Sequence, residues 1–194
     1  MADVVRTTRE PMVGQIRLAW WRERLEELDS GSAAPAEPRL QAVANHLRPL
    51  GLAGADAAAP EEAWAAVLTT AFPWNADIIP ALASRGEQLF ANGGRLLNCP
   101  SGPLDQAGAV WALMDFARHC SDAPSRRLLV EEARQRARAL ATARFASAQR
   151  PLTGLAALAV RDLIRGEPFE PEATRGRALV ILRHSVSGRL SRII

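Results

Sequence analysis

The sequence contains no lysine and no tyrosine, so all 24 of its strongly basic residues are arginines. They are balanced by 21 acidic residues, and the formal net charge is only +3. A nucleic-acid-binding protein needs basic residues clustered on one face or in one run. Here the arginines are spread from Arg6 to Arg192 and alternate with glutamates, so the sequence predicts no nucleic-acid partner.

Cysteine and long apolar runs are also scarce. The two cysteines, Cys99 and Cys120, lie far apart without a CxxC pair, which predicts reduced thiols in a cytoplasmic protein. No apolar run reaches the roughly 18 to 20 residues that a membrane-spanning helix needs, and the first ten residues lack the apolar core of a signal peptide. We therefore expect a cytoplasmic protein with no transmembrane segment.

One stretch leaves a membrane contact open. The sequence RGRALVILRHSVSGRLSRII places arginines on one side of a helix and leucine, valine and isoleucine on the other. This pattern is typical of a helix that packs on its own core, and also of one that lies in a membrane interface. Peripheral contact with the inner face of the membrane is therefore an alternative to a purely cytoplasmic location.

What the chain does have is helical spacing. Alanine, leucine, arginine and glutamate recur three and four residues apart, and alternation of β-branched residues is nearly absent. With 48% hydrophobic residues, a chain of 194 can bury one sizeable core. We predict an all-α fold of seven or eight helices in a single domain, residues 1–194. The expected helices cover residues 11–29, 38–50, a segment from Pro60, 76–98, 104–119, 123–147, 151–165 and 173–190.

Local signals set several of these boundaries. Thr7 and Glu10 have the spacing of a capping box before the first predicted helix. Asp122, followed by Pro124, is a strong start signal for the helix over 123–147. The alanine- and glycine-rich residues 51–60 are expected to form a loop.

The predicted helix over 11–29 contains IRLAWWRERL and has two apolar stripes. Such a wide apolar arc predicts that the helix has neighbours on two sides. It also predicts that both tryptophans pack in the core and do not stack on nucleic-acid bases. One stripe comprises Met12, Ile16, Ala19 and Trp20, and the other comprises Leu18, Trp21, Leu25 and Leu28.

Four stretches, in order along the chain, are similar to one family. They are EPMVGQIRLAWWRERLEEL, RGEQLFANGGRLL, GAVWALMDFARHCSD, and the end RPLTGLAALAVRDLIRG with RGRALVILRHSVSGRL. Together they resemble the squalene/phytoene synthase family, particularly its divergent bacterial branch. The stretches are also similar to a mitochondrial complex I assembly factor that belongs to this family. The resemblance implies the all-α isoprenoid-synthase fold with a central cavity.

Family enzymes join two prenyl diphosphates head to head, and the resemblance implies the chemistry that this requires. Mg²⁺ takes oxygen ligands in octahedral geometry and bridges diphosphate oxygens. Two DxxxD-type motifs on facing helices supply the carboxylates, since a spacing of four puts both on one helix face.

The second family motif is only partly present. With Gly108 on the motif's glycine, Asp115 falls on its asparagine and Arg118 on its arginine. His119 and Ala123 fall where the two metal-binding aspartates belong, so these metal positions are degenerate. The sequence thus predicts no metal site there.

The first family motif should lie just before residue 4, and only Asp3 could correspond to its last aspartate. We therefore expect the fold to be N-terminally shortened, lacking the first helix. The groove that this helix fills would then expose apolar surface, which predicts a homodimer or a protein partner. By resemblance, Arg17, Arg22, Arg118 and Asp115 are the candidate substrate-binding residues.

No other pattern supplies the missing chemistry. Glu23 and Glu27 are four apart, but Arg24 lies between them and local ion pairs are the expected outcome. The three histidines lack HExxH spacing, and His119 and Cys120, as neighbours on a helix, point about 100° apart. We assign no catalytic residue.

Two functions remain open. In the first, favoured hypothesis the chain is a non-catalytic relative that binds an isoprenoid or lipid ligand, or a protein partner as an assembly factor does, and needs no cofactor. In the second it is a prenyltransferase of the squalene/phytoene synthase type, and Mg²⁺ would be required. The loss of the aspartates favours the first, because two diphosphates need divalent cations to neutralise them.

Overall fold

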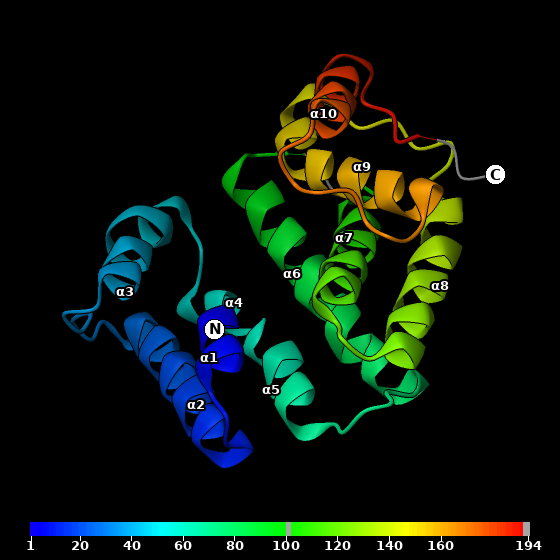
Figure 1. Ribbon diagram of the computed structural model, residues 1–194. Helices are drawn as coiled ribbons and strands as arrows, with labels where there is room; N and C mark the ends of the chain where they lie inside the picture. The colour runs from blue at the N-terminus through cyan, green and yellow to red at the C-terminus, as the bar shows by residue number, and fades with distance from the viewer. Residues whose placement is uncertain (100–101, 192–194) are drawn as a thin grey trace. The chain divides into compact units, whose positions relative to one another are not determined.

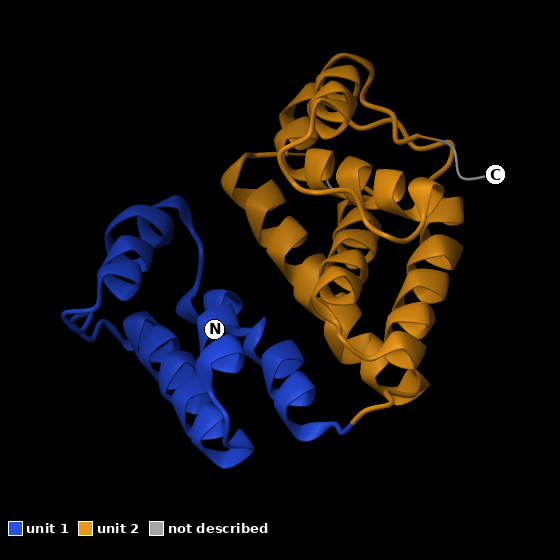
Figure 2. Cartoon of the chain, in the orientation of Figure 1, with its two compact units in different colours: residues 1–71 blue, residues 72–194 orange. Residues whose placement is uncertain are grey.

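The described residues, 1–99 and 102–191 of a computed structural model, form helices joined by loops and contain no β-strand (Figure 1). The all-α class is therefore confirmed. The chain divides into two compact units, residues 1–71 and 72–194 (Figure 2), and each is described by itself. The isoprenoid-synthase fold and the single-domain organisation stay predictions.

Unit 1 is built around a long helix and four short ones. Its core is a cluster of Leu25, Leu28, Leu40 and Ala58, against which Trp21 packs. The helices are α1 (Ala2–Thr7), α2 (Pro11–Glu27), α3 (Pro38–Ala42, continued by helical turns to Leu50), α4 (Gly54–Ala58) and α5 (Glu61–Thr69).

Two local predictions in unit 1 are wrong. Thr7 ends α1 and its hydroxyl donates to the carbonyl of Asp3, so it forms no capping box with Glu10. The predicted loop 51–60 contains helix α4, because the carboxylate of Asp29 accepts hydrogen bonds from the N–H groups of Gly54 and Ala55 at 2.7 and 2.9 Å. These bonds also lower the pKa of Asp29. A carboxylate at a helix start satisfies N–H groups that would otherwise have no partner.

Helix α2 buries only one of its two apolar stripes. Leu18, Leu25 and Leu28 are buried, whereas Met12, Ile16 and Trp20 are exposed. The prediction of neighbours on both sides of this helix is therefore wrong for the exposed stripe. Helix α4 contacts α2 at Leu25 and α5 contacts it at Gly14, and both positions lie on the buried side. The expected homodimer or protein partner stays a prediction.

Unit 2 is a bundle in which α7 is the central helix (Figure 1). Helices α6 and α8 pack along α7, α9 lies across it, and α10 packs on α9. The elements are a helical turn (Ala76–Ile78), α6 (Ile79–Leu96), α7 (Leu104–His119), α8 (Ala123–Ala139), α9 (Arg150–Arg165) and α10 (Arg175–Ser187). All lie within the ranges expected, apart from the one-residue earlier start of α9.

The backbones of α6 and α7 approach each other closely at two glycines. A Cβ on Gly86 would overlap the carbonyl of Gly108, and a Cβ on Gly108 would overlap the carbonyl of Gly86. The absence of both side chains lets the helices cross at this depth. Gly108, which the family resemblance places on the motif's glycine, thus has a packing role.

Helix α8 begins as predicted, with the carboxylate of Asp122 accepting from the N–H of Ser125 at 2.9 Å. It ends at Ala139 rather than near Ser147, because the following segment pairs with the end of α10. The N–H of Phe145 donates to the carbonyl of Gly188 at 2.7 Å, and Arg144 forms an isolated β-bridge with Arg189. This tertiary pairing has no local sequence signal.

Candidate functional site

A pocket of about 260 Å³ lies in unit 2 beside α7, α9 and the start of α10. One wall is apolar and one is charged. The apolar lining consists of Trp111, Met114, Leu155, Leu158 and Ala159, and the charged lining consists of Asp115, Arg118, Asp162, Glu172 and Arg177. Two of the four predicted substrate-binding residues, Asp115 and Arg118, are thus at one pocket.

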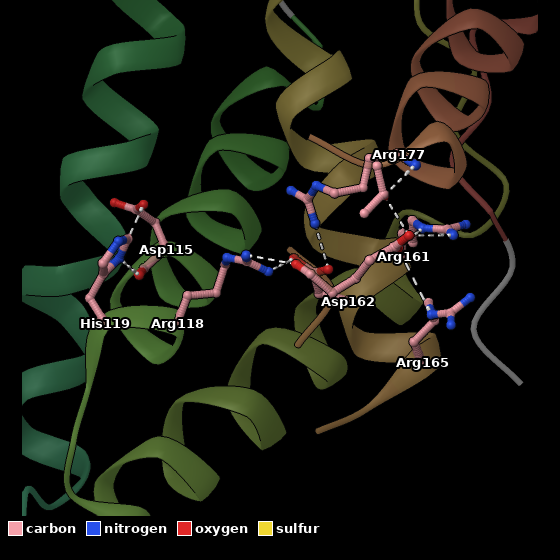
Figure 3. Close-up of polar contacts among 9 residues, drawn as sticks. Asp115, Arg118, His119, Arg161, Asp162, Arg165 and Arg177 are labelled. Carbon is pink, nitrogen blue, oxygen red and sulfur yellow. Dashed lines mark hydrogen bonds and ion pairs between the residues drawn. The ribbon is translucent and has the colours of Figure 1, made fainter. Parts of the chain in front are cut away.

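Asp162 is the centre of the charged wall (Figure 3). Its side chain is only 1% exposed, and it lies between two guanidinium groups. Nη1 of Arg118 donates to Oδ2 at 2.9 Å, and Nη1 of Arg177 donates to Oδ1 at 2.7 Å. A buried carboxylate needs such partners, because an unpaired charge loses its hydration without compensation. The cluster ties α7, α9 and α10 together.

Arg118 has two further contacts besides its ion pair with Asp162. Its Nη2 donates to the backbone carbonyl of Glu170 at 2.9 Å, and its guanidinium lies 5.7 Å from the ring centre of Phe169. The resemblance assigns Arg118 to the substrate diphosphate. In this structure its two terminal nitrogens donate to Asp162 and to the segment that precedes α10.

Glu170 fixes that segment to α9. Nε of Arg161 donates to its carboxylate at 2.5 Å, and the hydroxyl of Thr174 donates to it as well. These two hydrogen bonds, with that of Arg161 the larger effect, lower the pKa of Glu170 to about 2. The carboxylate therefore stays ionised, and the segment stays attached, throughout the physiological pH range.

Asp115 is held by an arginine. Nη1 of Arg85 on α6 donates to Oδ2 of Asp115 at 2.7 Å. The Arg85 guanidinium also lies 4.8 Å from the ring centre of Trp111 and 5.0 Å from that of Phe116. A buried guanidinium between two aromatic rings supplies the positive charge that neutralises the carboxylate.

The two degenerate metal positions do not fit Mg²⁺. Nδ1 of the exposed His119 lies 2.7 Å from the carbonyl oxygen of Asp115, so it must carry a proton there. Ala123 opens α8 and offers only a methyl group, and the nearby carboxylate of Asp122 is used to cap that helix. Mg²⁺ requires a set of oxygen ligands, and this donor set leaves Asp115, already paired, as the one carboxylate.

Arg17 and Arg22 lie in unit 1 and have partners there. Nη1 of Arg17 donates to the hydroxyl of Thr8 at 2.9 Å, and Nη1 of Arg22 lies 3.4 Å from Oε2 of Glu61. The acidic pair on the same helix behaves as expected: Arg24 binds Glu27 at 2.6 Å and lies 3.8 Å from Glu23. The substrate-binding role of Arg17 and Arg22 stays a prediction.

The two cysteines differ in burial, since Cys99 is half-buried and Cys120 is buried. Both cysteines are unpaired, and burial raises the pKa of the Cys120 thiol, which donates to the carbonyl of Asp122.

Across residues 1–99 and 102–191, no three histidine, cysteine or acidic side chains gather as a metal site would require. No helix in the same residues is long and apolar enough to cross a membrane.

Comparisons with protein-family models, with curated proteins and with solved structures each find no match. The fold and site thus define a class only: an all-α protein with an amphipathic pocket whose charges are largely paired within the chain. The squalene/phytoene synthase resemblance stays a prediction.

Arg85, Asp162 and Arg177 were not among the predicted site residues. A signal for Asp162 was present, since it is the one acidic residue in RPLTGLAALAVRDLIR and follows Leu158 by four positions on the apolar face. A lone carboxylate on such a face must find cationic partners. The identity of these partners depends on which helices pack together, and local spacing does not contain that information.

Proposed function

We propose that this chain is a non-catalytic binding protein of the squalene/phytoene synthase type, and that the pocket of unit 2 takes an uncharged prenyl chain or a similar apolar chain. The observation that carries the proposal is the pairing of the charged wall. Within the described residues, every charged side chain that lines the pocket has an ion pair except Glu172.

The sign of this remaining charge distinguishes between ligands. Glu172 repels a diphosphate, whereas its carboxylate can accept a hydrogen bond from a hydroxyl group. Arg118 and Arg177, the two cations at the pocket, share Asp162. An anion that recruited them would have to separate a buried cluster, which costs several kcal/mol.

The size of the pocket also favours one short apolar segment over a pair of prenyl diphosphates. Its volume of about 260 Å³ lies just below the roughly 300–1,000 Å³ of sites that enclose drug-sized ligands. A neighbouring, more open groove continues it along α10 and shares Leu158, Glu172 and Arg177 with it. Apart from Glu172, Thr174, Arg175 and Arg177 the groove is lined by apolar side chains, so an apolar chain can extend into it from the pocket.

The test is calorimetric titration with farnesol, a prenyl alcohol, in buffer that contains EDTA. Leu155→Glu places a charge on the apolar wall and is expected to weaken binding at least tenfold. Ile164→Glu is the matched control, because Ile164 is exposed on the same helix and lines neither the pocket nor the groove. This variant should bind farnesol as tightly as the wild type does.

Two results would contradict the proposal. The first is no binding of farnesol by the wild type, or equal binding by both variants. The second is turnover of prenyl diphosphates in the presence of Mg²⁺, which would establish the prenyltransferase alternative.

A further inference from the structure

Helix α10 buries two of its polar residues, Arg177 and His184, and exposes both of its leucines. Arg177 and His184 are buried against α9, where Arg177 binds Asp162 and Nε2 of His184 lies 2.8 Å from the hydroxyl of Thr153. On the opposite side, the exposed fractions are 65% for Leu179, 61% for Leu182 and 74% for Val186. A helix at the surface of a soluble protein normally has the reverse arrangement.

The three exposed residues, which we call the α10 stripe, form one continuous face. Their spacing of three and four places Leu179, Leu182 and Val186 above one another along the helix. Scattered exposed leucines are normal in soluble proteins, whereas a contiguous apolar face marks an interaction site.

The margin of the α10 stripe is positively charged. Four exposed arginines lie on α10 or on the two segments that pair at its end, and none has an acidic partner among the described residues. There is no acidic residue between positions 173 and 191, nor between 133 and 161. The arginines are Arg144, Arg175, Arg183 and Arg189.

This charge decides between the possible occupants. A second copy of the chain would bring the same arginines against themselves, and like charges at a contact are unfavourable. A nucleic acid would leave the apolar centre of the face without a partner. An anionic lipid surface satisfies both parts, because leucines enter the boundary of the acyl chains while arginines remain among the phosphates.

We propose that the α10 stripe, Leu179, Leu182 and Val186, together with its arginine margin docks this protein on an anionic membrane surface. The helix lies in the plane of the interface and does not span the bilayer. The docking requires neither the pocket nor its ligand, so it stands or falls independently of the proposed function.

The experiment is co-sedimentation of the full chain with vesicles of phosphatidylcholine alone and with vesicles that contain 30 mol% phosphatidylglycerol. We expect binding to the anionic vesicles only, weakened by salt. The double variant Arg183→Glu/Arg189→Glu should lower the partition coefficient roughly 30-fold or more, since each arginine near an anionic surface contributes about fivefold. Leu182→Glu should abolish binding.

The control is Leu50→Glu in unit 1, since Leu50 has the same 65% exposure as Leu179. It should bind as the wild type does. Circular dichroism checks that each variant is folded, and the arginine variant still provides a test if Leu182→Glu does not fold. The proposal is overturned by absent binding, by equal binding to both vesicle types, by full binding of the variants, or by a dimer in light scattering that Leu182→Glu dissociates.

Discussion

Replacing Asp162 by asparagine tests whether the charged wall of the pocket is a structural cluster. The substitution keeps the size of the side chain and removes its charge, so Arg118 and Arg177 lose their shared anion. Both arginine side chains are largely buried, at 16% and 11% exposed. The asparagine amide could still accept one hydrogen bond, but its NH₂ group would face a second guanidinium.

The size of the effect follows from the burial of the two ion pairs that Asp162 forms. Removing one partner of a buried ion pair costs about 3–5 kcal/mol, because the remaining charge stays uncompensated. For a chain of this length, 1 kcal/mol corresponds to roughly 2–4 °C in melting temperature. We therefore expect Asp162→Asn to lower the melting temperature by roughly 6–20 °C.

The assay is urea denaturation and thermal melting followed by circular dichroism. Glu131→Gln is the matched control, since Glu131 forms an exposed ion pair with Arg134 at 2.9 Å and such pairs contribute only about 0–1 kcal/mol. If Asp162→Asn were as stable as this control, the two arginines would not depend on Asp162. The interpretation of the pocket wall as internally paired would then be wrong.

Three further predictions concern the packing and its pH dependence. Gly86→Ala should destabilise the protein by about 1–3 kcal/mol, because the added methyl group meets the backbone of Gly108. The control is Gly94→Ala, whose methyl group meets only the tip of the Leu104 side chain, and its melting temperature should be close to that of the wild type. The pKa of Glu170 is lowered to about 2 in the folded state. In denaturation experiments the wild type should therefore be more stable than Glu170→Gln by a constant free energy above pH 4.5, and this difference should disappear as the pH falls toward 2. Burial, and to a smaller extent the charge of Arg150, lowers the pKa of His184. The unfolding free energy of the wild type should therefore fall as the pH drops below about 6.5, and it should fall less in His184→Gln.

Each of these has a result that would contradict it. Equal melting temperatures for the two glycine variants would show that α6 and α7 can separate without cost. A pH-independent difference for Glu170→Gln would mean that the carboxylate is not held by Arg161. An unfolding free energy of the wild type that rises below pH 6.5 would mean that the folded state binds the proton on His184 more tightly.

Helical periodicity predicted most of the fold, since α2, α6, α7 and α9 lie close to the expected ranges. The failures have a common cause. Helix α4 depends on Asp29, which is 25 residues away, and α8 ends early because its following segment pairs with residues after α10. These are tertiary interactions, and local propensity does not encode them.

The candidate site was predictable in part. Asp115 and Arg118 were identified from the family pattern and do line one pocket, but their partners come from other helices. Arg85 lies on α6 and Asp162 on α9, so their role appears only once the bundle is assembled. The sequence could show that the metal-binding aspartates of the family motif are missing. It could not show that Arg85, Arg118 and Arg177 pair with the carboxylates that are present.

The most direct test of the central claim is a calorimetric comparison of farnesyl diphosphate with farnesol, each measured with Mg²⁺ and with EDTA. We predict that farnesol binds more tightly and that Mg²⁺ changes neither affinity, because Glu172 repels the diphosphate and the site has no set of carboxylates for the ion. Tight binding of farnesyl diphosphate that requires Mg²⁺ would contradict the account.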